Sequence, residues 1–169
     1  NKTLSGTAGN DVLRGTLSDD FFAGSAGADQ LSGSTGNDTI EGRDDNDRLY
    51  GGASNDILRG GKGEDSLWGD DGNDLLTDES GNDALYGGEG NDTINAGEGN
   101  DDIGGGNGND LIYAGSGNDN ISAGGGADRV FGEEGDDAIT LGAGNDNAIG
   151  AEGNDTLLGG AGSDTFVFR

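Results

Sequence analysis

Aspartate has the most regular spacing of any residue type in this chain of 169 residues. It recurs at every ninth position, eighteen times, without an insertion. The series is Asp11, Asp20, Asp29, Asp38, Asp47, Asp56, Asp65, Asp74, Asp83, Asp92, Asp101, Asp110, Asp119, Asp128, Asp137, Asp146, Asp155 and Asp164. Carboxylates that meet in pairs can bind hard cations or serve as paired acids and bases. Because this Asp recurs in every nine-residue stretch from Asp11 to Asp164, a structural role is favoured over a catalytic carboxylate pair of the glycosidase or aspartic-protease kind.

The residue types that are absent exclude several kinds of catalysis. The chain has no His and no Cys, so it offers no imidazole base, no thiol nucleophile, no zinc site of the usual ligands and no disulfide. Ser and Thr are common, but no base accompanies them. The Gly spacing superficially resembles a dinucleotide-binding loop, yet it repeats without a following helix. We therefore expect no enzyme.

The charge balance limits the partners. The 34 acidic residues outweigh 8 basic ones, for a formal charge of −26. Such a chain is repelled by nucleic acid and by anionic lipid surfaces, and it favours a metal cation or a basic partner.

No run of about 18 apolar residues is present, so we expect no membrane span. The chain begins at Asn1 without Met, which indicates a segment of a larger protein.

Composition alone would favour intrinsic disorder, because only 29% of the residues are hydrophobic and 39 are Gly. The register contradicts that interpretation. With the repeated Asp set as position 6 of a nine-residue unit, 37 of the 39 Gly residues fall at positions 1, 2 or 4. Position 8 is bulky and apolar in all units except the one that carries Ala148. The Gly residues therefore belong to defined turns.

The nine-residue period predicts an all-β solenoid. Three residues with one apolar side chain between polar neighbours make a short strand, and six Gly-rich residues then turn the chain. Two units would close one coil, and stacked coils would form two facing parallel sheets. We expect about nine coils, with odd units in one sheet and even units in the other.

This geometry brings carboxylates together. Residues n and n+18 lie on adjacent coils, so two files of Asp would run along the rod with about 5 Å between neighbours. At an effective dielectric constant near 20, one such pair repels by roughly 3 kcal/mol. The ligand set consists of carboxylates and backbone carbonyls, which suits Ca²⁺ better than Mg²⁺. We therefore expect calcium between the coils.

The unit Gly-Gly-x-Gly-x-Asp-x-apolar-x resembles the RTX, or hemolysin-type, calcium-binding nonapeptide repeat, and the resemblance covers residues 6–167. It implies a right-handed parallel β-roll in which each calcium lies between loops of adjacent coils. It also implies that the ion is held by the position-6 carboxylates of units n and n+2 and by loop carbonyls. For one gap the implied ligands are Gly88, Gly90 and Asp92 with Gly105, Asn107 and Asp110.

The implied sites are not expected to be equal. Nine loops on each edge leave eight gaps, so at most about sixteen ions could bind. The first units carry side chains at positions 2 and 4, such as Thr7, Thr16, Asp45 and Ser54. Units 10 to 14 keep Gly at both positions: Gly88, Gly90, Gly97, Gly99, Gly106, Gly108, Gly115, Gly117, Gly124 and Gly126. We predict tighter binding in this central and C-terminal stretch.

We expect one array over residues 1–169. Residues 1–5 would be an N-terminal cap, because Leu4 keeps the apolar position while Lys2 replaces the Asp. Residues 6–167 would hold eighteen units, and residues 164–169 would form a C-terminal cap whose Phe166 and Phe168 cover the last coil.

The resemblance implies a module that folds on calcium binding and supports the secretion and extracellular stability of a larger bacterial protein exported by a type I channel. The alternative is a calcium-rigidified adhesin or spacer whose outer face binds a ligand. Aromatic residues at position 9 stack on successive coils: Tyr50, Trp68 and Tyr86 on one face, and Tyr113 and Phe131 on the other. Such ladders reflect β-propensity and mutual contact, or they could support docking and self-association.

Overall fold

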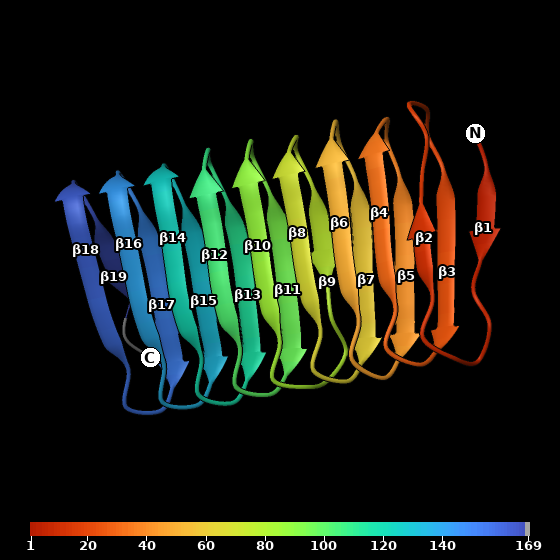
Figure 1. Cartoon of the computed structure of the whole chain (residues 1–169). Coiled ribbons are helices and arrows are strands. Elements are labelled where there is room, and N and C mark those ends of the chain that lie inside the picture. The colour runs from red at the N-terminus through yellow and green to blue at the C-terminus, as the bar shows by residue number, and fades with distance from the viewer. Residues whose placement is uncertain (168–169) are drawn as a thin grey trace.

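The computed structural model describes residues 1–167 and shows a β-solenoid in which every coil contributes one strand to each of two sheets (Figure 1). The ten-stranded sheet contains β1 (Thr3–Ser5), β3 (Phe21–Ala26), β5 (Thr39–Asp44), β7 (Ile57–Lys62), β9 (Leu75–Thr77), β11 (Thr93–Glu98), β13 (Leu111–Ser116), β15 (Arg129–Glu134), β17 (Asn147–Glu152) and β19 (Thr165–Val167). The nine-stranded sheet contains β2 (Val12–Arg14), β4 (Gln30–Thr35), β6 (Arg48–Ala53), β8 (Ser66–Asp71), β10 (Ala84–Glu89), β12 (Asp102–Asn107), β14 (Asn120–Gly126), β16 (Ala138–Gly144) and β18 (Thr156–Gly162).

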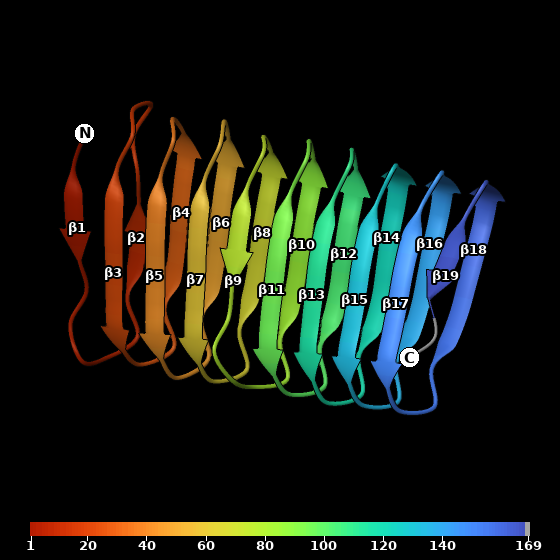
Figure 2. The ribbon, with the colours of Figure 1, turned by 180° about the vertical axis from the view of Figure 1, so that it is seen from behind.

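All strand pairs are parallel, and each joins a residue to its equivalent two units away in the sequence. Leu85 of β10, for example, pairs with Leu67 of β8 and with Ile103 of β12. The two sheets lie back to back along the whole rod, as the opposite views show (Figure 2). The predicted two-unit coil, the two facing parallel sheets and the alternation of units between them are confirmed.

The strands are longer than the predicted three residues. Most span six, covering positions 7 to 9 of one unit and positions 1 to 3 of the next. In β10 Leu85 and Gly87 are both buried and face the interior, and Tyr86 between them is half-buried. The prediction was wrong because Gly at position 1 was assigned to a turn, whereas it continues the alternation of the strand. The loop proper is therefore three residues long.

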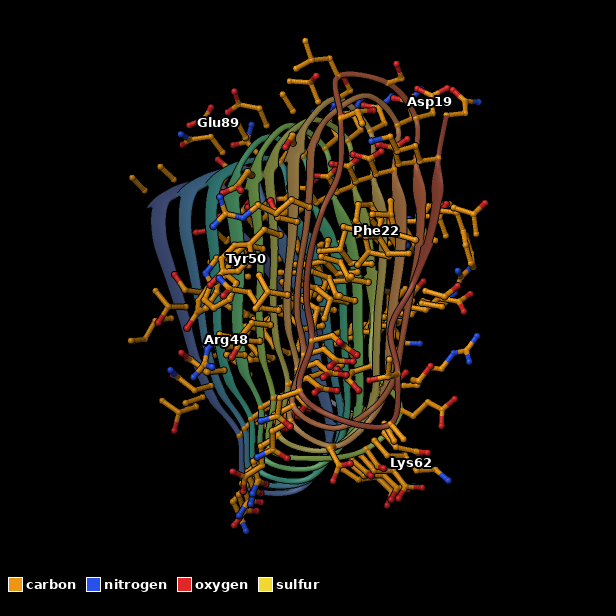
Figure 3. The ribbon with its side chains drawn as sticks, turned by 45° about the vertical axis from the view of Figure 1, so that its right-hand side comes forward. Asp19, Phe22, Arg48, Tyr50, Lys62 and Glu89 are labelled. Atoms are coloured by element: carbon orange, nitrogen blue, oxygen red, sulfur yellow. The ribbon has the colours of Figure 1, made fainter. Side chains whose placement is uncertain are left out.

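The interior is a single column of apolar side chains between the sheets. Fifteen of the eighteen position-8 residues are fully buried, from Phe22 to Ala148. Phe22 points between the sheets in an oblique view from the N-terminal end of the rod, whereas Arg48 and Tyr50 lie on the outer face (Figure 3). Position 1 adds a second, smaller column, which includes Ala96 and Leu141. Each coil therefore buries little apolar surface compared with its length.

At the two ends the solenoid closes with short strands of the ten-stranded sheet. Strand β1 pairs with β3, and β19 pairs with β17. Leu4 and Phe166 are partly buried and pack against the core column. The expected role of Phe168 in a C-terminal cap lies outside the described residues, and the cap assignments remain predictions. Among the described residues no helix has the length and apolar character that crossing a membrane requires.

The short loops need a backbone conformation that favours Gly. Positions 2 and 4 take positive φ angles, such as 113° at Gly88 and 125° at Gly90. Side chains occupy this conformation at Ser25, Ser34, Arg43, Asp45 and Ser54 in the N-terminal third, and at Asp70, Glu133 and Ala151 elsewhere. Loops after even-numbered strands lie at one edge of the rod and loops after odd-numbered strands at the other (Figure 1).

Candidate metal centres

The eighteen periodic Asp residues form two files, one along each loop edge of the rod. Each Asp immediately precedes a strand, so its side chain turns into the coil. Fifteen of the eighteen are buried, and those from Asp29 to Asp146 are at most 3% exposed. The structure thus brings together the carboxylates that the sequence placed two units apart.

Within each file, consecutive coils are joined by a hydrogen bond that the sequence did not predict. The amide N–H of each Asp donates to Oδ1 of the equivalent Asp two units later, as from Asp92 to Asp110 at 2.8 Å. The bond recurs in all sixteen gaps, with donor to acceptor distances from 2.6 to 3.2 Å. Because an amide donates to a charged acceptor, part of the expected repulsion between neighbouring coils is offset.

The second carboxylate oxygen has no such partner. In fourteen of the eighteen file residues, Oδ2 is buried and accepts no hydrogen bond from the described residues. These are Asp29, Asp38, Asp47, Asp56, Asp65, Asp74, Asp83, Asp92, Asp101, Asp110, Asp119, Asp128, Asp137 and Asp146. A buried unpaired charge is costly. Burial accordingly raises the pKa of Asp47 and of Asp56 to about 7.

Backbone carbonyls lie beside these orphaned oxygens. A Cβ atom placed on Gly87 would clash with Oδ2 of Asp92 and would lie 2.6 Å from the carbonyl oxygen of Gly105. The carboxylate of Asp92 and the carbonyl of Gly105 on the next coil therefore both lie beside Gly87, on the side where other residues carry a Cβ atom. Carboxylate and carbonyl oxygens without nitrogen or sulfur are the donor set that Ca²⁺ takes. The residues present fit a hard divalent cation.

The loop carbonyls at positions 2 and 4 point along the stack. A Cβ on Gly106 would clash with the carbonyl oxygen of Gly88, and one on Gly108 with that of Gly90. The position-3 carbonyl is already engaged, since that of Asn107 accepts the amide of Gly90 at 2.8 Å. A carbonyl oxygen has two lone pairs, so this bond leaves one free. The carbonyls expected as ligands thus lie in the gaps between loops.

The first two units differ from the rest. The amide of Thr16 donates to Oδ2 of Asp20 at 2.7 Å, and its hydroxyl donates to the same oxygen at 2.7 Å. Thr7 makes the same pair of bonds to Oδ2 of Asp11, at 2.6 and 3.0 Å. Here protein donors take the oxygen that is left bare in the later units. This difference is confined to units 1 and 2, because Oδ2 of Asp29, Asp38, Asp47 and Asp56 in units 3 to 6 lacks a partner as it does in the later units. The weaker binding expected over the whole N-terminal stretch stays a prediction.

A second side-chain ladder runs along the outer edge of the loops and was missed by the sequence analysis. Position-5 Asn residues accept the amide of the equivalent residue two units later, as Asn73 does from Asn91 and Asn91 does from Asn109, both at 2.7 Å. This direction is opposite to that of the Asp ladder. The recurrence of Asn immediately before the Asp was the available signal.

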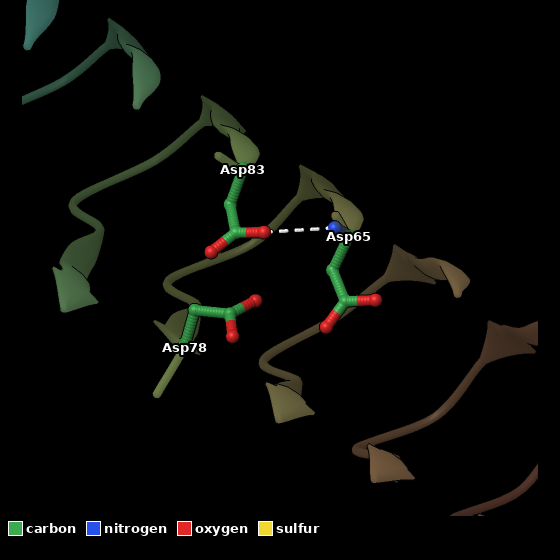
Figure 4. A group of neighbouring side chains, drawn as sticks. All are labelled: Asp65, Asp78 and Asp83. Atoms are coloured by element: carbon green, nitrogen blue, oxygen red, sulfur yellow. Dashed lines mark hydrogen bonds between the residues drawn. The ribbon is translucent and has the colours of Figure 1, made fainter. Parts of the chain in front are cut away.

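One buried acid breaks the repeat. Asp78 occupies position 1 of its unit, follows β9, and is 8% exposed. Single carboxylate oxygens of Asp65, Asp78 and Asp83 lie within 4.8 Å of one another (Figure 4). Burial, followed by the carboxylates of Asp83 and Asp65, raises the pKa of Asp78 to about 8. The signal in the sequence was an acid where the pattern has Gly or another apolar residue.

The outer aromatic residues contact one another. The rings of Tyr50 and Trp68 are stacked with centroids 4.7 Å apart, and those of Trp68 and Tyr86 with centroids 6.2 Å apart. On the other sheet Tyr113 stacks on Phe131 at 4.9 Å. Trp68 is the middle ring of its ladder, so both of its faces are turned towards neighbouring rings.

Comparison with known proteins identifies the repeat. The family model of the RTX calcium-binding nonapeptide repeat matches nine overlapping or adjacent segments: residues 3–31, 24–58, 32–67, 41–76, 50–83, 68–103, 77–112, 104–139 and 140–168. Together these matches extend from residue 3 to residue 168. No curated protein matches the chain.

Proposed function

Because this chain belongs to the RTX calcium-binding nonapeptide repeat family, we propose that it is a module that folds when calcium fills the gaps between its coils. Members of the family are calcium-binding repeats, and such repeats are typical of secreted bacterial proteins. The module would keep a larger protein unfolded where calcium is scarce and would fold it outside the cell, supporting its secretion and extracellular stability.

The observation that carries this proposal is the set of fourteen buried Oδ2 atoms without a hydrogen-bond partner. Each leaves a charged oxygen out of water, and the chain has too few cations to pair them, with 8 Lys and Arg against 34 Asp and Glu. Calcium would supply the missing charge between neighbouring coils. Because the ligands converge only in the closed solenoid, the free energy of ion binding contributes to folding.

The residues proposed to hold the ions are the file Asp residues and the loop carbonyls beside them. In one gap, Asp92 and Asp110 would supply carboxylate oxygens, and Gly88, Gly90 and Gly105 would supply carbonyl oxygens. The bound cation neutralises the acidic files and joins adjacent coils. The Asp amide ladder and the Asn ladder fix the register of the loops, so that the ligands of a gap are aligned with one another once the two coils have stacked.

No catalytic role is proposed, because the files repeat one environment along the rod and offer no base besides the carboxylates. A ligand-binding adhesin face remains the second candidate. The stacked rings of Tyr50, Trp68 and Tyr86 argue against it, since a sugar packs on a free aromatic face and the faces of Trp68 are turned to its neighbours. Mutual stacking along the ladder accounts for these residues.

A calcium titration of the whole chain tests the proposal. Starting from chelator, far-ultraviolet circular dichroism and Trp68 fluorescence are followed as calcium is added. We expect a disordered spectrum in chelator and a cooperative change to a sheet spectrum with calcium, and a smaller effect of Mg²⁺ at the same concentration. A sheet spectrum already present in excess chelator would contradict calcium-dependent folding.

A further inference from the structure

Asp78 stands where the repeat has no acid. Position 1 of the unit faces the interior, and from Gly6 to Gly159 it is occupied by Gly, Ala or Leu in every unit except the one that contains Asp78. Its neighbours one coil away are Gly60 and Ala96. A carboxylate at this position is thus not supplied by the nonapeptide pattern, and the regular gaps between loops contain no counterpart to it.

The backbone around Asp78 departs from the regular coil. Strand β9 ends at Thr77 after three residues, whereas its neighbours β7 and β11 continue for six. The carboxylate is fixed at one oxygen, since Oδ1 accepts the amides of Glu79 at 2.7 Å and Gly61 at 3.1 Å. The side chain is therefore held in one orientation.

The other oxygen is directed into the gap between two coils. Oδ2 of Asp78 is buried and accepts no hydrogen bond from the described residues. The close view shows the carboxylate of Asp78 beside those of Asp65 and Asp83, which come from successive coils (Figure 4). Gly60 makes the space, because a Cβ there would clash with Oδ2 of Asp78 and would lie 2.6 Å from Oδ2 of Asp65.

The three carboxylates have the spacing of cation ligands. One oxygen from each lies within 4.8 Å of the others. Oxygens bound to one Ca²⁺ at 2.3 to 2.6 Å can be at most about 5.2 Å apart, so the three fit around a single ion. The three residues are at most 8% exposed, so water cannot readily screen their mutual repulsion.

We propose that Asp65, Asp78 and Asp83 form a three-carboxylate calcium site that binds its ion more tightly than the two-carboxylate gaps and fills first. Affinity for Ca²⁺ depends on the number of charged ligands and on the rigidity of the site, and Asp78 increases both. The inference rests on the proposed calcium-dependent function. It specifies that calcium binding begins in the gap between the coils of Asp65 and Asp83. The position of Asp78 near the middle of the array lets coils close in both directions from this ion.

Calorimetric calcium titration with native mass spectrometry of the full chain tests the site. Asp78→Ala introduces the residue that Ala96 and Ala114 already place at position 1, and Asp78→Asn keeps the shape of the side chain. Both should weaken binding of the first calcium at least tenfold. Asp71→Asn, which removes an exposed carboxylate of β8, is the charge-matched control and should leave the first ion unchanged. Unchanged binding of the first ion in both Asp78 variants would overturn the proposal.

A second measurement does not depend on the folding of the variants. In crystals of the wild-type chain grown at limiting calcium, anomalous density should lie within about 2.6 Å of Oδ2 of Asp78 and should have the highest occupancy of any site. Density that is absent at Asp78 while regular gaps are filled would contradict the site. If the wild-type chain keeps its sheet spectrum in chelator, the proposed folding switch fails, whereas the density at Asp78 still decides the site.

Discussion

Oδ1 of Asp110 accepts the amide N–H of Asp92 at 2.8 Å, while Oδ2 of the same carboxylate is buried without a partner. The two oxygens thus have different roles. One fixes the register between adjacent coils, and the other leaves a charge that the described residues do not satisfy. This division recurs along both files, and it explains how one Asp per unit can specify the stack and still be available to a cation.

Asp110→Asn should weaken calcium binding in the gaps beside Asp110 while keeping the hydrogen bond from the amide N–H of Asp92. The amide oxygen of Asn can still accept the N–H of Asp92, but the charged Oδ2 is lost. Because Asp110 borders two gaps, we expect one or two fewer bound ions per chain and a higher calcium concentration at the folding midpoint. Native mass spectrometry counts the ions. Glu89→Gln is the control, because it removes one negative charge from an exposed side chain of β10 and should keep the full number of bound calcium ions. An equal loss of ions in both variants would contradict the assignment.

Thr16→Gly should strengthen calcium binding at Asp20, near the N-terminal end, where we expect binding to be weak. The amide and hydroxyl of Thr16 occupy Oδ2 of Asp20, and Gly at position 2 can take the positive φ angle seen in later units. We expect one additional calcium, or a tighter N-terminal site, by calorimetry. Thr35→Gly at position 3 is the control. The explanation for weak N-terminal sites fails if Thr16→Gly binds no more calcium than the wild type.

Leu85→Ala should destabilise the calcium-saturated solenoid through its narrow core. Leu85 is completely buried between the sheets, and truncation of a buried Leu costs about 2 to 5 kcal/mol. Leu158→Ala is a matched control, because Leu158 is 59% exposed and should change stability by about 0.5 kcal/mol or less. Denaturant unfolding at saturating calcium gives both values. Similar losses for the two variants would show that the position-8 column is not the core.

Trp68→Ala separates the two interpretations of the outer aromatic ladder. Trp68 stacks on Tyr50 and on Tyr86, and aromatic pairs contribute about 0.5 to 1.5 kcal/mol each. We therefore expect a loss of about 1 to 3 kcal/mol in the free energy of unfolding at saturating calcium. If the variant instead keeps its stability and loses binding to a glycan or cell surface, the adhesin alternative is favoured.

Lower pH should favour order in the metal-free chain. Burial raises the pKa of Asp47 and Asp56 to about 7, so a proton binds the folded chain more tightly than the unfolded one, whose Asp pKa is about 4. This contribution to stability is complete below about pH 4 and is lost as the pH rises through about 7. Circular dichroism of metal-stripped protein should show more sheet at pH 5 than at pH 8. The opposite trend would mean that these carboxylates are stabilised as anions without metal.

The nine-residue spacing was enough to predict the coil length, the two parallel sheets and the two Asp files, because side-chain alternation and strand pairing follow directly from the period. Strand length was not predictable in the same way, since Gly87 reads as a turn residue until its pairing is known. The amide bond from Asp92 to Asp110 was also missed, because a repeat pattern describes side chains and not the direction of backbone N–H groups. Asp78 could have been recognised as the one acid at position 1.

Small-angle X-ray scattering of the chain, with and without calcium, tests most directly whether cations close the solenoid. We expect a radius of gyration of about 15 Å at saturating calcium and about 43 Å in chelator, the values for a folded and an unfolded chain of 169 residues. The same small radius in both conditions at neutral pH would show that the buried carboxylates are tolerated without metal, and would contradict calcium-dependent closure of the solenoid.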